Sequence, residues 1–177
     1  MDWDGRLFAF LDDLEQQAQA LYDADRGSEL ADRARSEYAG VTLVSRLMAT
    51  VDRDVVLDVR GVGPVTGLIR RVGPDWSLVH GAAQDWVVRL AAVRSVEGAS
   101  DRSVPEVAWS PVSRLGLGSA LRRLADTGAA CRLHSVDGAV WDAYLVRIGA
   151  DFVEARVGED RLVLLARDAL AAVQSRE

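Results

Sequence analysis

The sequence predicts a mainly β protein of the α+β class: an N-terminal amphipathic helical segment, then two tandem small β-barrels, each opened by a short helix. The first observation is a repeated phrase, Arg-Val-Gly-Pro-Asp-Trp at 71–76 and Arg-Ile-Gly-Ala-Asp-Phe at 147–152. An internal repeat at this spacing indicates two modules built alike. The second observation is that a short helical pattern and five short strand patterns surround each copy. The third is that residues 1–40 carry only helical periodicity.

Length and composition indicate a folded protein that does not cross a membrane. The 177 residues are 49% hydrophobic, enough to bury a core. No run approaches the roughly 18 apolar residues of a membrane span. The N-terminus begins Met-Asp-Trp-Asp, whereas a secretion signal begins with basic and then apolar residues. The single cysteine, Cys131, excludes an internal disulfide, so we expect a cytoplasmic protein.

The charged residues are biased in type and in position. All 21 basic residues are arginine, there is no lysine or asparagine, and only two residues are isoleucine. Codons for these rare residues are AT-rich, which indicates a high-GC bacterial source. Residues 1–40 hold 4 Arg against 10 Asp and Glu, whereas 41–98 carry +1 and 99–177 carry −1. The chain therefore lacks the overall basic footprint of a dedicated nucleic-acid binder.

The acidic N-terminal segment has the pattern of an amphipathic helix between about 3 and 22. Its apolar stripe recurs at spacings of four and three and comprises Leu7, Leu11, Leu14, Ala18 and Leu21. Ser28 can cap a second helical stretch that runs to about Tyr38. Two interpretations stay open: the stripe packs on its own domain, or it pairs with a partner or a second copy.

Four regions follow from these patterns: a helical segment at 1–40, a helix-plus-barrel repeat at 41–98, a linker at 99–112 and a second repeat at 113–177. Thr42 caps the first predicted short helix, which runs to about Thr50. Strands are expected at 55–59, 65–72, 76–80, 86–90 and 93–96. A second helix is expected at 119–126, with strands at 130–134, 140–148, 152–157, 161–165 and 170–173.

The repeated phrase marks a bend between the second and third strands of each module. Gly73 and Pro74 favour a bend, and the Asp75 side chain can cap it by bonding nearby amides. Asp151 recurs at the same place, so both carboxylates are interpreted as turn caps. Trp76 recurs as an aromatic residue, Phe152, and is interpreted as a core anchor. Closing each sheet into a barrel would remove exposed edges.

A helix followed by five bent strands, with Gly67 in the second strand, resembles the Sm-like (SH3-like) small barrels, a family that contains RNA-binding ring proteins. The whole chain also resembles an uncharacterised actinobacterial family. Its pattern is Trp3-Asp4, a Val-Thr-Leu-x-x-Arg-Leu helix at 41–47, two Val/Ile-Gly-x-Asp-aromatic phrases and an Ala-Leu-Ala-Ala-Val tail at 169–173. The first resemblance implies RNA binding. However, the asparagine that reads a base in Sm-like pockets has no counterpart in this chain.

Motifs for catalysis, cofactors or metals have simpler explanations here. Gly61-x-Gly63-x-x-x-Gly67 resembles a dinucleotide fingerprint, but a strand pattern follows it where that chemistry needs a helix. His80 and His134 do not occupy equivalent places and have no cysteine partners at metal-ligand spacing. Cys131 lies on the inward alternation of a strand, as a small buried hydrophobe. We therefore predict no catalytic residue, cofactor, metal or small-molecule substrate.

The leading prediction is a non-enzymatic interaction module or assembly scaffold, with the N-terminal helix contacting a partner protein or a second copy. The alternative is an Sm-like RNA or nucleic-acid binder that uses local arginine patches. Trp86 and Trp141 do not recur as aromatics, which suggests an inter-module contact or an exposed binding surface. The candidate partner or nucleic-acid residues are Arg70, Arg71, Arg122, Arg123, Arg147, Trp86 and Trp141.

Overall fold

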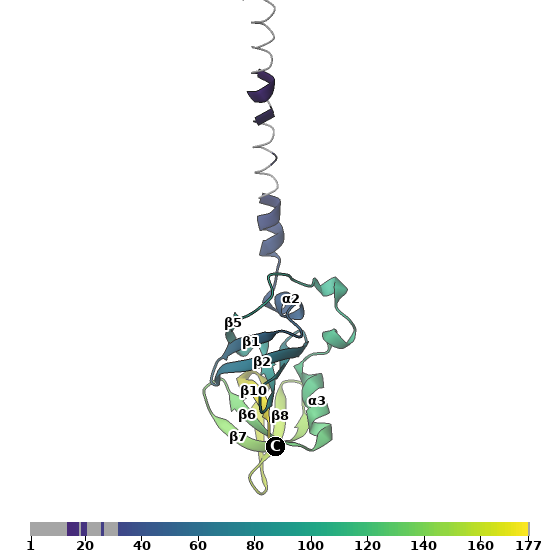
Figure 1. The fold of residues 1–177 in the computed structure, drawn as a ribbon. Coiled ribbons are helices and arrows are strands. Elements are labelled where there is room, and N and C mark those ends of the chain that lie inside the picture. Colours follow the sequence, from purple (N-terminus) through teal and green to yellow (C-terminus); the bar gives the residue numbers. More distant parts are fainter. Residues whose placement is uncertain (1–13, 18, 21–25, 27–31, 177) are drawn as a thin grey trace, which may run out of the picture. The chain divides into compact units, whose positions relative to one another are not determined.

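The computed structural model describes residues 14–17, 19–20, 26 and 32–176 (Figure 1). The chain divides into two compact units, Met1–Val41 and Thr42–Glu177. In the first unit, residues 32–39 are helical and exposed, and Arg33 pairs with Glu37 one turn later at 3.2 Å. Of the amphipathic helix predicted at 3–22, the structure describes only residues 14–17 and 19–20, which are helical, and the rest lies outside the described residues. The described residues therefore do not establish the predicted N-terminal helix.

The second unit is built on one antiparallel sheet of ten strands. The first set of five is β1 (Asp54–Val59), β2 (Gly63–Val72), β3 (Trp76–His80), β4 (Asp85–Arg89) and β5 (Val93–Glu97). The second set is β6 (Ala130–Ser135), β7 (Val140–Ile148), β8 (Phe152–Val157), β9 (Arg161–Ala166) and β10 (Leu170–Ser175). The strands lie in the order β5-β1-β2-β3-β4-β10-β6-β7-β8-β9.

The prediction of two closed Sm/SH3-like barrels is wrong, because the ten strands form a single open sheet. Closing the first set would need β4 to pair with β5 of the same set. Instead β4 pairs with β10, which places Val88 opposite Ala172 and Val87 opposite Val173. Strands β4 and β10 thereby supply hydrogen-bond partners for each other's edge backbone groups. The sheet ends at β5 on one side and at β9 on the other.

Two short helices accompany the strands close to where the sequence predicts them. Helix α2 (Leu43–Met48) begins at Thr42, whose hydroxyl accepts the Ser45 amide while the Ser45 hydroxyl accepts the Thr42 amide. This reciprocal pair is a capping box and explains the start of α2. Helix α3 (Leu117–Thr127) ends at Gly128, whose φ of 63° is the left-handed conformation that glycine adopts without strain.

The glycine of the repeated phrase is required by the aromatic residue three positions later. A Cβ atom added at Gly73 would lie 2.1 Å from Nε1 of Trp76, and one added at Gly149 would lie 2.3 Å from Cε1 of Phe152. Each glycine amide also donates to the carbonyl of its aromatic residue, at 2.8 and 2.9 Å. The phrase is therefore a turn in which an aromatic ring lies against a bare backbone.

The hydrophobic core has two clusters, and each one draws on both strand sets. The cluster of the second set includes Trp76 and Val87 from β3 and β4. The cluster of the first set includes Ala171 and Ala172 from β10. Because each core is completed by the other set, we conclude that the two sets fold as one body.

The predicted linker at 99–112 is fastened to the first set. The Ser100 amide donates to the Thr50 hydroxyl at 3.0 Å, and Nε of Arg46 donates to the Ser100 carbonyl at 2.8 Å. The Val104 amide donates to the carbonyl of Ser45 at 2.9 Å. The segment leading into α3 therefore starts from a fixed position against α2.

Candidate functional site

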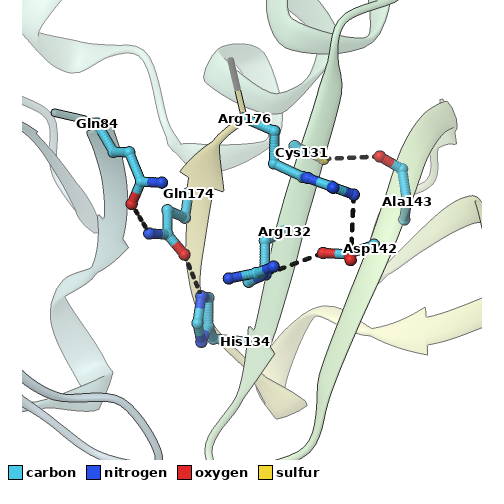
Figure 2. Close-up of polar contacts among 8 residues, drawn as sticks. All are labelled: Gln84, Cys131, Arg132, His134, Asp142, Ala143, Gln174 and Arg176. Atoms are coloured by element: carbon cyan, nitrogen blue, oxygen red, sulfur yellow. Dashed lines mark hydrogen bonds and ion pairs between the residues drawn. The ribbon is translucent and has the colours of Figure 1, made fainter.

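The junction of β4 with β10 carries a chain of buried and half-buried polar contacts (Figure 2). Gln174 on β10 donates through Nε2 to the side-chain oxygen of Gln84, which lies in the turn before β4. The Gln174 oxygen lies 2.9 Å from Nε2 of His134 on β6. The His134 ring also contacts the Trp86 ring of β4, with centroids 5.3 Å apart. These contacts bind the two strand sets to each other.

The titratable groups near this junction are held in their neutral or paired forms. Burial lowers the pKa of His134, which favours the neutral ring. Burial also raises the pKa of the Cys131 thiol to about 11, with the charge of Asp142 as a smaller contribution. A neutral thiol is a poor nucleophile and a poor metal ligand, so Cys131 serves as core.

Asp142 on β7 lies between two arginines, Arg132 and Arg176, in an exposed group of ion pairs (Figure 2). Its carboxylate accepts from Nε of Arg132 at 2.9 Å and pairs with Nη1 of Arg176 at 3.1 Å. The hydrogen bond from Arg132 lowers the pKa of Asp142. These contacts join β6, β7 and the end of β10, which is a structural role for the three side chains.

The first copy of the repeated phrase clamps the start of helix α3. Oδ1 of Asp75 accepts a hydrogen bond of 2.7 Å from the Leu117 amide, and Nε1 of Trp76 donates to the Leu115 carbonyl at 2.8 Å. The Asp75 prediction therefore needs correction. Its carboxylate caps a helix 42 residues later, rather than its own turn. An acidic group at a helix N-terminus satisfies a free amide and interacts favourably with the helix dipole.

The second copy of the phrase has the same backbone turn but covers nothing. The Asp151 carboxylate makes no hydrogen bond or ion pair with any residue in the described part of the chain. Phe152 is 37% exposed, against 7% for Trp76. The prediction that Asp151 caps its turn is therefore not met either. The two aspartates differ in what lies against them, not in their local backbone.

The pairing of the strands shows that the two sets correspond with a one-residue shift between β8 and β9. Ser77 pairs with Val88 in the first set, and Val153 pairs with Leu165 in the second. Ser77 and Val153 are 76 residues apart, but Val88 and Leu165 are 77 apart. The two phrases lie 76 residues apart in the sequence, but this spacing does not extend to the fourth strand, where Val87 corresponds to Leu164.

This correspondence exposes the largest difference between the two sets. Val87 is 7% exposed because it packs into the core of the second set, whereas Leu164 is 67% exposed at the free edge. Leu162, on the same face two residues before, is 59% exposed. We call Asp151, Phe152, Leu162 and Leu164 the outer face. Its three apolar side chains have no covering element among the described residues, and the charged Glu154 and Arg156 of β8 lie opposite Leu164 and Leu162.

Sequence reasoning missed the leucines of the outer face, although a signal was present. Residues 162–165 read Leu-Val-Leu-Leu, an unbroken apolar run rather than an alternating one. A run of this kind is typical of a strand that is covered on both faces. Only one face of β9 is covered by the residues that the structure describes, since Leu165 is buried and Leu164 is not.

The five predicted arginines come from three elements and are partly neutralised. Arg70 on β2 pairs with Asp52 at 2.7 Å. Arg147 on β7 holds Glu154 through two hydrogen bonds of 2.9 and 3.0 Å, which raises the pKa of Arg147. Arg122 on α3 bonds Ser119 of the same helix at 3.3 Å, while Arg71 and Arg123 are exposed. Trp86 lies at the junction, and Trp141 packs half-buried against the second core.

A polar hollow of about 290 Å³ lies at the start of α3. Guanidinium nitrogens of Arg122 and Arg167 approach the Gly118 backbone there, a geometry that could receive an anion. The carboxylate of Asp75 also lines the hollow and already accepts the first amide of the helix. The protein thus supplies its own anion at this helix end.

The described residues contain neither a membrane-spanning helix nor a cluster of metal ligands. No helix there is long and apolar enough to cross a membrane. No group of three or more His, Cys, Asp or Glu side chains in that part of the chain is placed to hold a metal ion. In comparisons with known proteins, no family model and no curated protein matches the chain.

Proposed function

We propose that this protein is a non-enzymatic interaction module, an assembly scaffold whose contact surface is the outer face. The observation that carries the proposal is Leu164, a leucine 67% exposed on β9, an edge strand that pairs with β8 on one side only. Edge strands of natural proteins are usually protected by charge, proline or a covering element, because a free edge recruits other chains. An apolar free edge is therefore a feature expected of a surface that binds a protein.

The polar groups of the second unit support a structural role over a catalytic one. His134 is engaged with Gln174, Asp142 with two arginines, and the Cys131 thiol with the Ala143 carbonyl. Groups held this way stabilise the junction between the sets. The acidic segment 1–40 stays a second proposed contact element, on the sequence pattern alone.

The nucleic-acid alternative has weaker support in the contacts. Two of the five candidate arginines, Arg70 and Arg147, are held by acidic side chains. Phosphate binding weakens steeply with added salt. Retention of RNA at low salt that is lost with added salt, and that falls in an Arg71→Ala, Arg123→Ala variant, would favour this alternative.

Site-specific photocrosslinking in the expressing cell tests the proposed function. A photoreactive amino acid replaces Leu164 on the outer face, Leu14 in the N-terminal segment, or Val107, an exposed residue of the linker that serves as the control. The proposal predicts a discrete protein product from position 164 that position 107 does not give. A protein crosslinked at position 14 would indicate that the N-terminal segment also contacts a partner. If position 164 gives no protein product beyond the control, the proposed function is contradicted.

A further inference from the structure

The two free edges of the ten-stranded sheet correspond to the two strands that join in its middle. Strand β9 holds the place in the second set that β4 holds in the first, and β5 holds the place of β10. The chain already pairs β4 with β10. The free edge of β9 therefore corresponds to the β4 side of the β4–β10 junction, and the free edge of β5 corresponds to its β10 side.

The strand register fixes which residues of β5 and β10 correspond. Leu57 pairs with Val96 in the first set, and Leu133 pairs with Val173 in the second. Val96 therefore takes the place of Val173, just as Leu164 takes the place of Val87. At the junction Val87 lies opposite Val173. The same register between two copies would place Leu164 opposite Val96.

The contact between Asp75 and the start of α3 extends the correspondence between the two strand sets to their helices. Leu117 begins α3 and gives its amide to Asp75, and Leu121 four residues later is fully buried. Leu43 begins α2, and Leu47 four residues later is fully buried as well. The Leu43 side chain is exposed, and its amide donates to no backbone carbonyl among the described residues. Among the described residues, no helix start lies against Asp151 within one chain, and a second copy would supply one at Leu43.

We propose that the outer face binds a second copy of this chain, head to tail. The β9 edge of one copy pairs with the β5 edge of the next in the register of β4 with β10, and Asp151 accepts the Leu43 amide. This inference rests on the proposed function and names its partner. The contact is heterologous, so the two copies use different surfaces and each keeps one free edge. Repeating it yields a ring if the rotation closes, and a filament if it does not.

The burial pattern explains why the second copy is a suitable occupant. At the junction, β10 and α3 together cover Trp76 and Val87. On a second copy, β5 and α2 would cover Phe152 and Leu164 in the same way. Opposite Leu164 would lie Val96, which is half-buried and apolar. In this register Glu97 of β5 would lie opposite Val163, in the place that Gln174 takes opposite Trp86, and Arg94 would lie outside the paired residues.

Cross-linking between two differently tagged copies tests the register. One copy carries Leu164→Cys, the other carries Val96→Cys, and a short bismaleimide joins thiols that lie close together. The buried Cys131 stays in both copies, and Val107→Cys replaces Val96→Cys in the control mixture. We expect a heterodimeric product from 164 with 96 and none from 164 with 107. A product only between two copies of Leu164→Cys would overturn the head-to-tail proposal in favour of symmetric edge pairing.

Sedimentation of full-length variants tests the contact without added cysteines. Leu164→Arg places a charge on the outer face, and Val107→Arg places the same charge on the linker. We expect concentration-dependent mass for the wild type and the Val107 variant, and at least about a tenfold weaker association for the Leu164 variant. Unchanged thermal unfolding would show that both variants fold. A wild type that stays monomeric at all concentrations overturns this inference, yet a different protein crosslinked at position 164 would leave the proposed function standing.

Discussion

The carboxylate of Asp75 accepts a 2.7 Å hydrogen bond from the backbone amide of Leu117, the first residue of α3. The two residues belong to different strand sets, so a bend in the first set fixes where the helix of the second set begins. The corresponding carboxylate, Asp151, contacts no helix start among the described residues. This pair of aspartates supplies a direct comparison of a covered and an uncovered copy of one motif.

Replacing Asp75 with alanine is expected to lower the free energy of unfolding by about 1 kcal/mol, the usual effect of losing a helix cap. Urea denaturation of the full chain measures the change. Asp151→Ala is the matched control. It is measured at a concentration low enough to keep the chain dissociated, and it should leave the stability within about 0.5 kcal/mol of the wild type. Equal losses in the two variants would contradict the assignment of Asp75 as the cap of α3.

Removing the hydroxyl of Ser77 is expected to leave the protein as stable or to stabilise it. Ser77 is fully buried on β3, and its hydroxyl has no hydrogen-bond partner among the described residues. The corresponding residue of β8 is the apolar Val153. An unsatisfied buried polar atom is unfavourable by about 1–3 kcal/mol, so Ser77→Ala should raise the urea midpoint. A clear loss of stability would show that the hydroxyl has a partner after all.

The Cys131 thiol is expected to react slowly with a thiol reagent in the folded protein and rapidly in denaturant. Its pKa is raised to about 11 by burial, whereas an ordinary thiol titrates near 9.0. Between these values the unfolded chain releases a proton that the folded chain keeps, so stability should fall as the pH rises through this range. A Cys131→Ala variant should lack that part of the decline. Fast labelling of the native protein at neutral pH would contradict the burial of the thiol.

His134 is expected to make the protein less stable as the pH falls. Burial lowers its pKa below the ordinary 6.5, so the unfolded chain binds a proton at a pH where the folded chain does not. Stability should therefore decline as the pH drops below about 6.5. His134→Gln should flatten the decline in the urea midpoint between neutral and mildly acidic pH. His80→Gln, at an exposed position beside Asp85, should leave His134's share of the decline in place.

Sequence patterns predicted the strands well because each strand of this fold is bounded by local signals. Alternation in β1 places Val55, Leu57 and Val59 inward, and glycines mark the turns. Closure was not predictable, because whether β4 pairs with β5 or with β10 depends on contacts between residues more than 80 positions apart. The partner of Asp75 was missed because Leu117 lies 42 positions away, beyond the reach of any local pattern. The extra residue lies in the turn between β8 and β9, and the unbroken apolar run at 162–165 shows no alternation that would reveal the one-residue shift.

The central claim is that the free edge of β9 repeats the interface already formed by β4. Hydrogen exchange of the full-length protein, followed while its concentration is raised, tests this claim most directly. We predict that amides of β9 and β5 become protected together, and that the Leu43 amide at the start of α2 follows them. Rapid exchange of the outward-facing β9 amides at every concentration, with β5 unchanged, would contradict the claim.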